Sequence, residues 1–337
     1  MSSRQGVLLR RPEGRPREGD IGFVEVPVPE PGPGQLVVRN TWMSLDPSMR
    51  IRMSGGSDDY LPPFAIGEPL SGWAVGTVVA SRSTAFAEGD QVMHGSGWRD
   101  HALLDEAGPG PETMRPELLP AGEPARWYLG PLGWVGLTSW VGLHDVASLA
   151  LGDRVFVSGA AGAVGGLVVQ IAARLGHEVI GSAGTAEKVA HVRALGASAA
   201  FCYRDGPVGS LLAEAAPDGI DVYFDNVGGD HLVAALDALR PGGRVALCGA
   251  ISTYDAADPV PGPPNLFNAV ARGLTLRGFM ARMYPHRLGK FRERMREWLV
   301  EGSVTYPETI YNGLDAAPGA FADLLAGGNV GKVLVEL

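Results

Sequence analysis

The sequence predicts an α/β protein in which a doubly wound parallel sheet accompanies a smaller antiparallel, barrel-like domain. The first ~125 residues are rich in Pro and Gly and contain short runs of β-branched residues. From Asp153 to about Gly302, short apolar runs alternate with helical patterns. Because 337 residues are more than one hydrophobic core usually organises, we expect two domains, residues 1–126 with 306–337 and residues 127–305.

The first domain is predicted to consist of short strands. The runs at 35–40, 72–81 and 90–96 are rich in β-branched residues and bounded by turn residues. Prolines between 27 and 33 keep the segment before Gln35 extended, because proline fixes φ and lacks an N–H group. The chain ends in the strand-like run 332–337, which we expect to return to this domain.

The second domain shows the βαβ alternation of a doubly wound sheet. Short apolar runs separated by amphipathic segments predict parallel strands that alternate with helices. The expected strands lie at 154–159, 178–184, 199–203, 221–227 and 244–250, and the expected helices at 163–176, 186–196 and 288–302.

Composition and charge exclude several classes of function. The net charge of -9 would repel a phosphate backbone, so we expect no nucleic-acid partner. Cys202 and Cys248 are too few for a disulfide framework or a four-thiolate zinc site. The N-terminus lacks a signal-peptide core, and no segment approaches the roughly 20 apolar residues that span a bilayer. A cytoplasmic protein without membrane association is therefore predicted.

A glycine-rich turn lies between the first strand and the first helix of the second domain. In the run Gly159-Ala-Ala-Gly162-Ala163-Val164-Gly165, Gly162 would let the backbone approach a pyrophosphate. Gly165 would let helix and strand pack closely, and the helix N-terminus offers N–H groups to phosphates. Ala160 stands in place of the usual first glycine. A tight turn without a ligand is the alternative, but the strand, helix and alternation favour dinucleotide binding.

The end of the second strand indicates which dinucleotide is bound. NAD-preferring folds place Asp or Glu about 20 residues past the glycines, where the carboxylate binds the ribose hydroxyls. The segment from Ser182 to Thr185 has no carboxylate, and Lys188 in the next helix can neutralise a 2′-phosphate. Lys188 taken alone is better explained as a solvated helix residue. Together with the missing acid, it favours NADP(H).

The sequence predicts that no metal takes part in the chemistry. A zinc dehydrogenase needs Cys, His and carboxylate ligands, and the first domain contains no cysteine. His94 and His101 have no thiolate nearby in the sequence, and Glu68 has no neighbouring histidine. Hydride acceptance is therefore expected to depend on hydrogen-bond donors.

Several motifs in order resemble a known family. They are SLDPSMR at 44–50, AAGAVG at 160–165, GSAGTAEK at 181–188, DVYFDNVGG at 221–229, LCGAISTY at 247–254 and GNVGK at 328–332. The chain resembles the zinc-independent medium-chain dehydrogenases/reductases, in particular the leukotriene/prostaglandin reductases and the alkenal double-bond reductases. The resemblance implies a GroES-like barrel, a Rossmann domain and a homodimer. It also implies NADPH-dependent reduction of the carbon–carbon double bond of small enals and enones.

The resemblance also implies a set of cofactor-binding residues. Lys188 and Tyr203 would surround the 2′-phosphate, and Asn226 would lie near the cofactor ribose. A plain strand-to-loop turn is the alternative for DNVGG, but the position of Asn226 at the carboxyl end of a strand favours cofactor contact. The full set is Gly162, Ala163, Val164, Gly165, Lys188, Tyr203, Asn226, Cys248, Gly249, Ala250, Ile251, Ser252, Tyr254, Phe279, Met280, Ala281 and Asn329.

Tyr254 is the predicted catalytic residue. When hydride reaches the β-carbon of an enone, negative charge moves to the carbonyl oxygen, where a phenol hydroxyl can stabilise it. The same hydroxyl could deliver the α-carbon proton, and the ribose hydroxyl or water could share either task. The alternative is that Tyr254 only packs against the cofactor.

The substrate pocket departs from the family pattern at one position. Relatives commonly have a tyrosine where this chain has Ser48, so the pocket is expected to be larger or more polar. Trp42 and Tyr60 are candidates to refill that space.

Three other functions use the same cofactor turn. A quinone oxidoreductase would lack Tyr254, which argues against it. Metal-free oxidation of secondary alcohols would show little activity on conjugated double bonds. A non-catalytic NADPH-binding protein is a further alternative, and the joint retention of Lys188, Asn226, Tyr254 and Asn329 argues against it.

Overall fold

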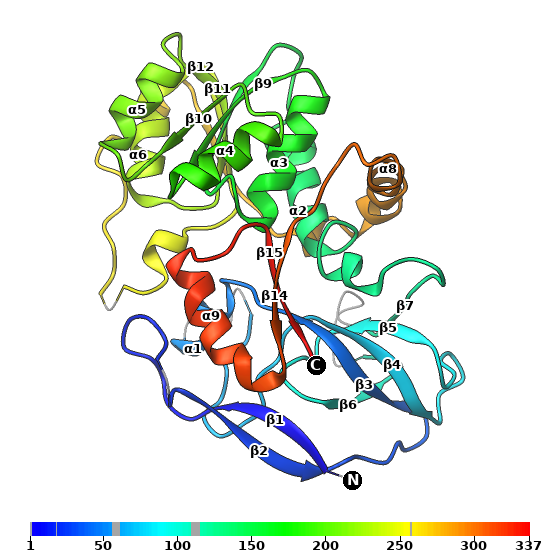
Figure 1. Ribbon diagram of the computed structural model, residues 1–337. Helices are drawn as coiled ribbons and strands as arrows, with labels where there is room; N and C mark the ends of the chain where they lie inside the picture. Colours follow the sequence, from blue (N-terminus) through cyan, green and yellow to red (C-terminus); the bar gives the residue numbers. More distant parts are fainter. Residues whose placement is uncertain (1, 18, 56–60, 109–114, 257) are drawn as a thin grey trace. The chain divides into compact units, whose positions relative to one another are not determined.

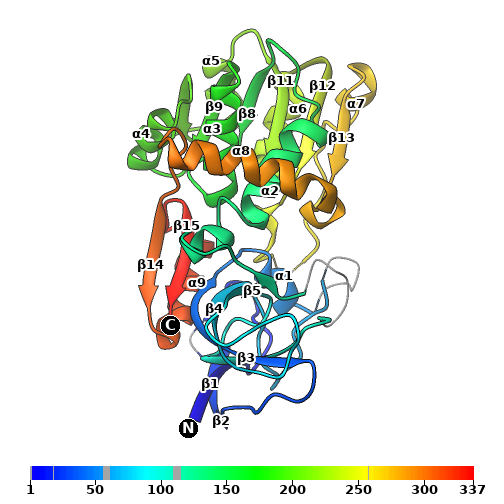
Figure 2. The ribbon, with the colours of Figure 1, turned by 90° about the vertical axis from the view of Figure 1, so that its right-hand side faces the viewer.

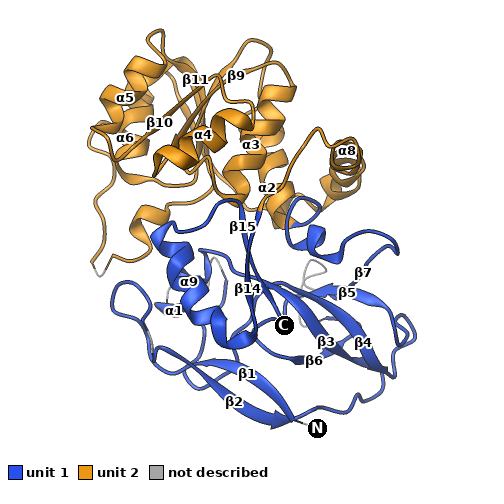
Figure 3. Cartoon of the chain, in the orientation of Figure 1, with its two compact units in different colours: residues 1–133, 308–337 blue, residues 134–307 orange. Residues whose placement is uncertain are grey.

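The computed structural model describes residues 2–17, 19–55, 61–108, 115–256 and 258–337. The chain forms two compact units, residues 1–133 with 308–337 and residues 134–307 (Figure 3). One unit contains a wholly parallel sheet and the other a separate, mostly antiparallel sheet, which confirms the predicted fold class. The functional boundaries proposed above, 126/127 and 305/306, stay a prediction.

The first unit is built on a seven-stranded sheet of order β14-β15-β3-β4-β5-β7, with β6 also paired to β3 and β1–β2 forming a separate hairpin (Figure 1). Strand β15 pairs antiparallel with β3 through Leu334 and Ser44, as the strand-like end of the chain predicts. The elements are β1 Ser2–Leu8, β2 Ile21–Pro27, β3 Gln35–Ser44, α1 Met49–Met53, β4 Ala74–Ser81, β5 Gln91–His94, β6 His101–Asp105, β7 Glu117–Leu118, η2 Ala125–Leu129, β14 Glu308–Asn312, η7 Leu314–Ala316, α9 Ala317–Ala326 and β15 Lys332–Glu336.

The second unit contains a six-stranded parallel sheet of order β10-β9-β8-β11-β12-β13, with β13 and α7 at one edge (Figure 2). The elements are α2 Trp134–Val141, η3 Gly142–Val146, β8 Arg154–Val157, α3 Ala163–Arg174, β9 Glu178–Ala183, α4 Ala186–Ala194, β10 Ala199–Cys202, α5 Val208–Ala215, β11 Ile220–Asp225, α6 Gly229–Ala238, β12 Leu239–Leu247, η4 Ile251–Thr253, α7 Asn268–Ala271, β13 Thr275–Gly278, η5 Ala281–Met283, η6 Pro285–Arg287 and α8 Leu288–Val300.

Helices cover both faces of the parallel sheet. On one face, α5 and α6 pack over Phe156, Ile180 and Tyr223, which form one buried cluster. On the other face, Gly142 lies against the ring of Phe224, where an added Cβ would be only 2.3 Å from the ring. Burial of apolar surface on both faces stabilises this sheet and explains its continuous apolar strands.

The strand order reverses between β8 and β11. From β8 the chain moves to β9 and β10, and it then returns to β11 and moves the other way to β12 and β13. In open α/β sheets, ligands bind at the carboxyl ends of the strands beside such a reversal. The loops after β8, β9, β11 and β12 are therefore where a ligand is expected.

None of the described helices is long and apolar enough to cross a membrane.

Candidate functional site

In the glycine turn after β8, a residue with a side chain would strain or displace the backbone. Gly159 has a φ of +59°, in the left-handed region. An added Cβ on Gly165 would lie 2.3 Å from the carbonyl oxygen of Gly159, and one on Gly162 would lie 3.2 Å from the same atom. Helix α3 can therefore begin directly against the strand, with its N-terminus at the carboxyl edge of the sheet.

The start of α3 has the character of an anion site. Among the described residues, no side chain caps the helix at Gly162, and its first turn carries no acidic residue. The first N–H groups of a helix have no acceptor within the helix. Because α3 is 12 residues long, its dipole adds to the attraction for an anion. Gly162, Ala163, Val164 and Gly165 thus fit the pyrophosphate of a dinucleotide.

The ends of β9 and β10 bring the predicted 2′-phosphate residues together. Thr185 caps α4 by accepting a hydrogen bond of 3.2 Å from the Lys188 N–H. The Tyr203 N–H donates to Ala183, and its hydroxyl would lie 3.0 Å from a Cβ on Gly184. Burial, and next the charge of Arg204, lower the pKa of Lys188. An anion at this corner would stabilise the charged lysine.

A buried carboxylate, which the sequence analysis did not single out, organises the turn after β11. Asp225 is 1% exposed and accepts hydrogen bonds from the Tyr223 hydroxyl at 2.7 Å and from the N–H groups of Val227 at 2.9 Å and Gly228 at 2.7 Å. Burial raises the pKa of Asp225, while these bonds oppose the rise. The signal was present in the sequence as an acid ending an apolar strand.

Asn226 joins the ends of β8 and β11, where the strand order reverses. Its N–H donates to the Ser158 hydroxyl at 3.0 Å, and its side-chain Nδ2 donates to the Ser158 carbonyl at 2.8 Å. The turn geometry expected of DNVGG is therefore present. The Asn226 Oδ1 takes no part in these two bonds, so the turn and a ribose contact are compatible.

The loop that carries Tyr254 is fastened to the turn after β11. The N–H groups of Cys248 and Gly249 donate to the Asp225 carbonyl at 2.9 and 3.0 Å. The Ser252 hydroxyl donates to the Val227 carbonyl at 2.6 Å. Since the Asp225 carboxylate holds that turn in place, it also determines where the loop with Tyr254 lies.

The Tyr254 hydroxyl is folded back onto its own loop. It accepts a hydrogen bond of 3.2 Å from the Ala250 N–H, and a Cβ on Gly249 would lie 3.1 Å from it. Accepting this bond does not use the hydroxyl hydrogen. The bond therefore contributes to orienting the phenol.

Cys248 lies in the same loop but does not supply a nucleophile. Burial, and next the charge of Asp225, raise the pKa of its thiol to about 12. The thiol is protonated at neutral pH, and only the thiolate is reactive.

Phe279, Met280 and Ala281 follow the end of β13. The Phe279 ring packs edge-on against Phe224 of β11, with ring centroids 6.2 Å apart. Met280 precedes η5 and Ala281 is buried. This contact brings the segment to the carboxyl end of β11, the same edge that carries Asn226.

Two motifs from opposite ends of the chain meet in the first unit. Lys332, 2% exposed, donates from Nζ to the Leu45 carbonyl and to Asp46, both at 2.8 Å. Asn329 is buried and donates from Nδ2 to the Gly331 carbonyl at 2.7 Å. The partly buried ion pair of Lys332 and Asp46 holds GNVGK beside SLDPSMR, a contact that the sequence did not predict.

The predicted pocket residues also belong to the first unit. Ser48 is partly buried and precedes α1. Trp42 is partly buried in β3, with the Arg126 guanidinium 5.7 Å from its ring centroid. Tyr60 lies outside the described residues. A role for these three residues in a substrate pocket stays a prediction.

His94 and His101, the two histidines considered as metal ligands, both belong to the first unit. Burial lowers the pKa of His94 to about 3, and its Nδ1 accepts a hydrogen bond of 3.1 Å from the Ser96 N–H. His101 begins β6, and its backbone N–H donates to the Ser3 hydroxyl. In the part of the chain that the structure describes, no group of three or more His, Cys, Asp or Glu side chains could hold a metal ion.

Comparisons with known proteins agree with this architecture. Residues 4–110 match the family model described as the N-terminal domain of oxidoreductase, and residues 163–300 match the model described as zinc-binding dehydrogenase. The 2-alkenal reductase (NADP(+)-dependent) of Nicotiana tabacum is 36% identical over 341 residues, which cover 99% of this chain and 97% of the relative. This chain belongs to the zinc-independent medium-chain dehydrogenase/reductase family.

Two further members of this family match the chain over almost its full length. Prostaglandin reductase 1 of Mus musculus is 34% identical over 343 residues, which cover 100% of this chain and 99% of the relative. The crystal structure of CurA in complex with NADPH from Vibrio vulnificus has a TM-score of 0.92 and 35% identity, covering 99% of this chain and 98% of that one. The resemblance predicted from the motifs is therefore confirmed.

Proposed function

We propose that this oxidoreductase uses NADPH to reduce the carbon–carbon double bond of α,β-unsaturated aldehydes or ketones. The observation that carries the proposal is the Tyr254 hydroxyl, oriented by the Ala250 N–H in a loop fastened to the end of β11. The names of the reductases in Nicotiana tabacum and Mus musculus support the reaction type.

The predicted cofactor, NADP(H), agrees with the names of the relatives and with the NADPH bound in the Vibrio vulnificus structure. When bound, NADPH supplies a hydride. Gly162 to Gly165 would hold its pyrophosphate, Lys188 and Tyr203 its 2′-phosphate, and Asn226 its ribose. Phe279 to Ala281 and the loop from Cys248 to Tyr254 would border the nicotinamide half. Asn329 would be a further cofactor-binding residue.

Tyr254 stabilises the charge that develops on the substrate. Its oxygen accepts from the Ala250 N–H, and its O–H would donate to the substrate carbonyl, because a hydroxyl that accepts one hydrogen bond donates a stronger one. This donation stabilises the developing enolate more than the neutral ground state. An ordinary phenol, with a pKa of about 10, is a slow acid at neutral pH, so solvent completes protonation of the α-carbon.

The reaction is tested by following NADPH absorbance with enals, enones, quinones and, in reverse with NADP, secondary alcohols. Tyr254→Phe should lower kcat on enones about tenfold or more, because it removes a donor that acts mainly in the transition state. An unchanged kcat would leave Tyr254 as a packing residue. Turnover of quinones alone, of alcohols alone or of no acceptor despite tight NADPH binding would each overturn the proposed reaction.

The resemblance implies a homodimer, whereas the net charge and the lack of long apolar segments underlie the other expectations about the enzyme's setting. We expect a cytoplasmic homodimer acting on a small-molecule substrate, with no nucleic-acid or membrane partner. Light scattering on the purified full chain checks the oligomeric state. A monomer at micromolar concentration would contradict the homodimer.

A further inference from the structure

The register of β9 and β10 places two cationic residues at one corner of the sheet. The strands are parallel neighbours, and Cys202 at the end of β10 pairs with Ala183 at the end of β9. The chain therefore leaves both strands at the same level. Arg204 follows β10 by two residues, and Lys188 lies in the first turn of α4, which follows β9.

The two charges are close enough to affect one another. The charge of Arg204 is the second cause, after burial, that lowers the pKa of Lys188. Glu187 opposes this effect, but only as the smallest of the three causes. Two cations at one corner of the sheet repel one another, and an anion bound there would offset the repulsion.

Arg204 is held in place by an aromatic ring rather than by a carboxylate. Its guanidinium carbon lies 5.7 Å from the centroid of the Tyr203 ring. That ring in turn packs edge-on against His231, with centroids 5.3 Å apart. Among the residues that the structure describes, Arg204 forms no ion pair with an acidic side chain, and the side chain is exposed.

We propose that Arg204 is a specificity-determining residue that binds the 2′-phosphate of NADP(H) together with Lys188 and Tyr203. The proposal rests on the proposed function only through the cofactor. A phosphate monoester carries nearly two negative charges at neutral pH, and one lysine neutralises only part of them. Arginine adds a second charge and a planar pair of donors that suits phosphate oxygens.

A purely structural role for Arg204 gives a different expectation. A cation–π contact at an exposed position such as Arg204 changes an equilibrium about two- to fivefold. If Arg204 only steadied Tyr203, its removal would weaken ligands with a 2′-phosphate by no more than this and would leave the salt dependence of binding unchanged. If Arg204 binds the phosphate, its removal causes a larger loss for these ligands and makes the salt dependence shallower.

The experiment uses two nucleotides that lack nicotinamide, adenosine 2′,5′-bisphosphate and adenosine 5′-monophosphate, in calorimetric titrations of the full chain. Arg204→Gln should raise the Kd for the bisphosphate about tenfold and change that for the monophosphate less than about twofold. Arg204→Lys should recover part of the loss. The exposed Lys290 of α8 provides a matched control, since Lys290→Gln removes the same charge from the same unit and should leave both Kd values unchanged.

Each other outcome overturns the proposal. A loss for the bisphosphate with an unchanged salt dependence would assign Arg204 to holding Tyr203. Equal losses for both nucleotides would show a general disturbance of the site, and unchanged binding of the bisphosphate would make Arg204 a solvated residue. A shallower salt dependence for the Gln variant is also expected, because one fewer charge is screened. Neither probe can accept or donate hydride, so failure of the enone reaction leaves this test intact, and a failure here leaves that reaction standing.

Discussion

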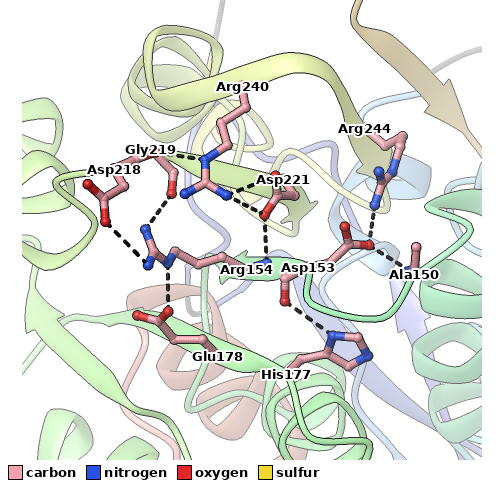
Figure 4. A network of polar contacts seen from close by, with 10 residues as sticks. All are labelled: Ala150, Asp153, Arg154, His177, Glu178, Asp218, Gly219, Asp221, Arg240 and Arg244. Carbon is pink, nitrogen blue, oxygen red and sulfur yellow. Dashed lines mark hydrogen bonds and ion pairs between the residues drawn. The ribbon is translucent and has the colours of Figure 1, made fainter.

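The two ends of the parallel sheet in the second unit treat charge in opposite ways. At the amino end, charged side chains from neighbouring strands bind one another in a network (Figure 4). Arg154, at the start of β8, donates to Glu178 at 2.8 Å and to the Gly219 carbonyl at 3.0 Å, and its N–H donates to Asp221 at 2.9 Å. Arg240 also binds Asp221, and Arg244 binds Asp153.

At the carboxyl end, the segments that follow the strands present backbone N–H groups, the buried Asp225 and the cationic Lys188 and Arg204. The Asp225 carboxylate there is bound by a phenol and by backbone N–H groups. The exposed Arg204 lies over a ring and, among described residues, pairs with no acid. Charges at the amino end are satisfied within the protein, whereas the carboxyl end presents donors and cations suited to an anionic ligand.

The two ends of the sheet are therefore expected to contribute to different properties, the amino end to stability and the carboxyl end to cofactor binding. Substitution at the amino end should change the free energy of unfolding and leave cofactor binding alone. Substitution at the carboxyl end should do the reverse wherever it does not disturb the core.

The largest effect is expected at the glycine turn. Gly165→Ala places a Cβ where the Gly159 carbonyl oxygen lies 2.3 Å away, so the backbone must move. We expect the Kd for NADPH to rise about a hundredfold, equivalent to about 3 kcal/mol. Fluorescence titration measures the Kd, and thermal unfolding without cofactor shows whether the variant is folded.

Alanine substitutions at two further glycines should have smaller effects on the Kd for NADPH. At Gly162 the added Cβ would lie 3.2 Å from the same oxygen, so Gly162→Ala should have a smaller effect than Gly165→Ala. At Gly289 in α8 nothing lies within 4 Å of the added Cβ, so Gly289→Ala should leave binding unchanged. Wild-type affinity in Gly165→Ala would show that the close approach of helix and strand is not needed for the cofactor.

The second largest effect is expected at the amino end of the sheet. Arg154→Met removes the bonds to Glu178 and Gly219, and we expect the free energy of unfolding to fall by about 1–2 kcal/mol. Urea unfolding measures this change, and the Kd for NADPH should stay within about twofold of wild type. Arg294→Met is the control, because its exposed pair with Glu297 is separated by one helical turn and contributes at most about 0.5 kcal/mol. A loss of cofactor binding in Arg154→Met would break the division between the two ends.

The parts of this fold that local signals encode could be predicted from the sequence. The apolar runs predicted β8 to β12, and the glycine spacing predicted the turn before α3. Strand β13, Thr275–Gly278, was missed because it is short and largely exposed at the sheet edge, so it shows no buried apolar pattern. The hairpin β1–β2 was missed for a similar reason, since only part of each strand is buried.

The contacts that complete the candidate site could not be predicted, because they depend on tertiary register. Lys332 and Asp46 are 286 residues apart, and only the pairing of β15 with β3 brings them together. Arg204 gains significance only because β10 ends level with β9. Asp225 was visible within DVYFDNVGG, but two of its donors, the N–H groups of Val227 and Gly228, depend on the turn that it stabilises.

An effect of similar size is expected at the carboxyl end, where it tests whether the buried His231 stays uncharged. His231, in the first turn of α6, stacks on Phe156 and meets Tyr203 edge-on, and its Nε2 has no hydrogen-bond partner among the described residues. Burial lowers its pKa to about 4. An unfolded chain takes up a proton as the pH falls through about 6.5, while the folded chain stays neutral until about 4. Stability is therefore lost between these two values as the pH falls.

His231→Phe should remove part of this pH dependence, since a phenyl ring packs in the same cluster and does not titrate. Between pH 7 and pH 5, as measured by urea unfolding, the wild type should lose about 1–2 kcal/mol more stability than the variant. The exposed His286 is the control, and His286→Gln should follow the wild-type curve. If the curves of wild type and His231→Phe run parallel, His231 accepts its proton without cost in the folded state. The carboxyl end of the sheet would then tolerate a buried cation beside Tyr203, and its contrast with the amino end would be weaker than the structure indicates.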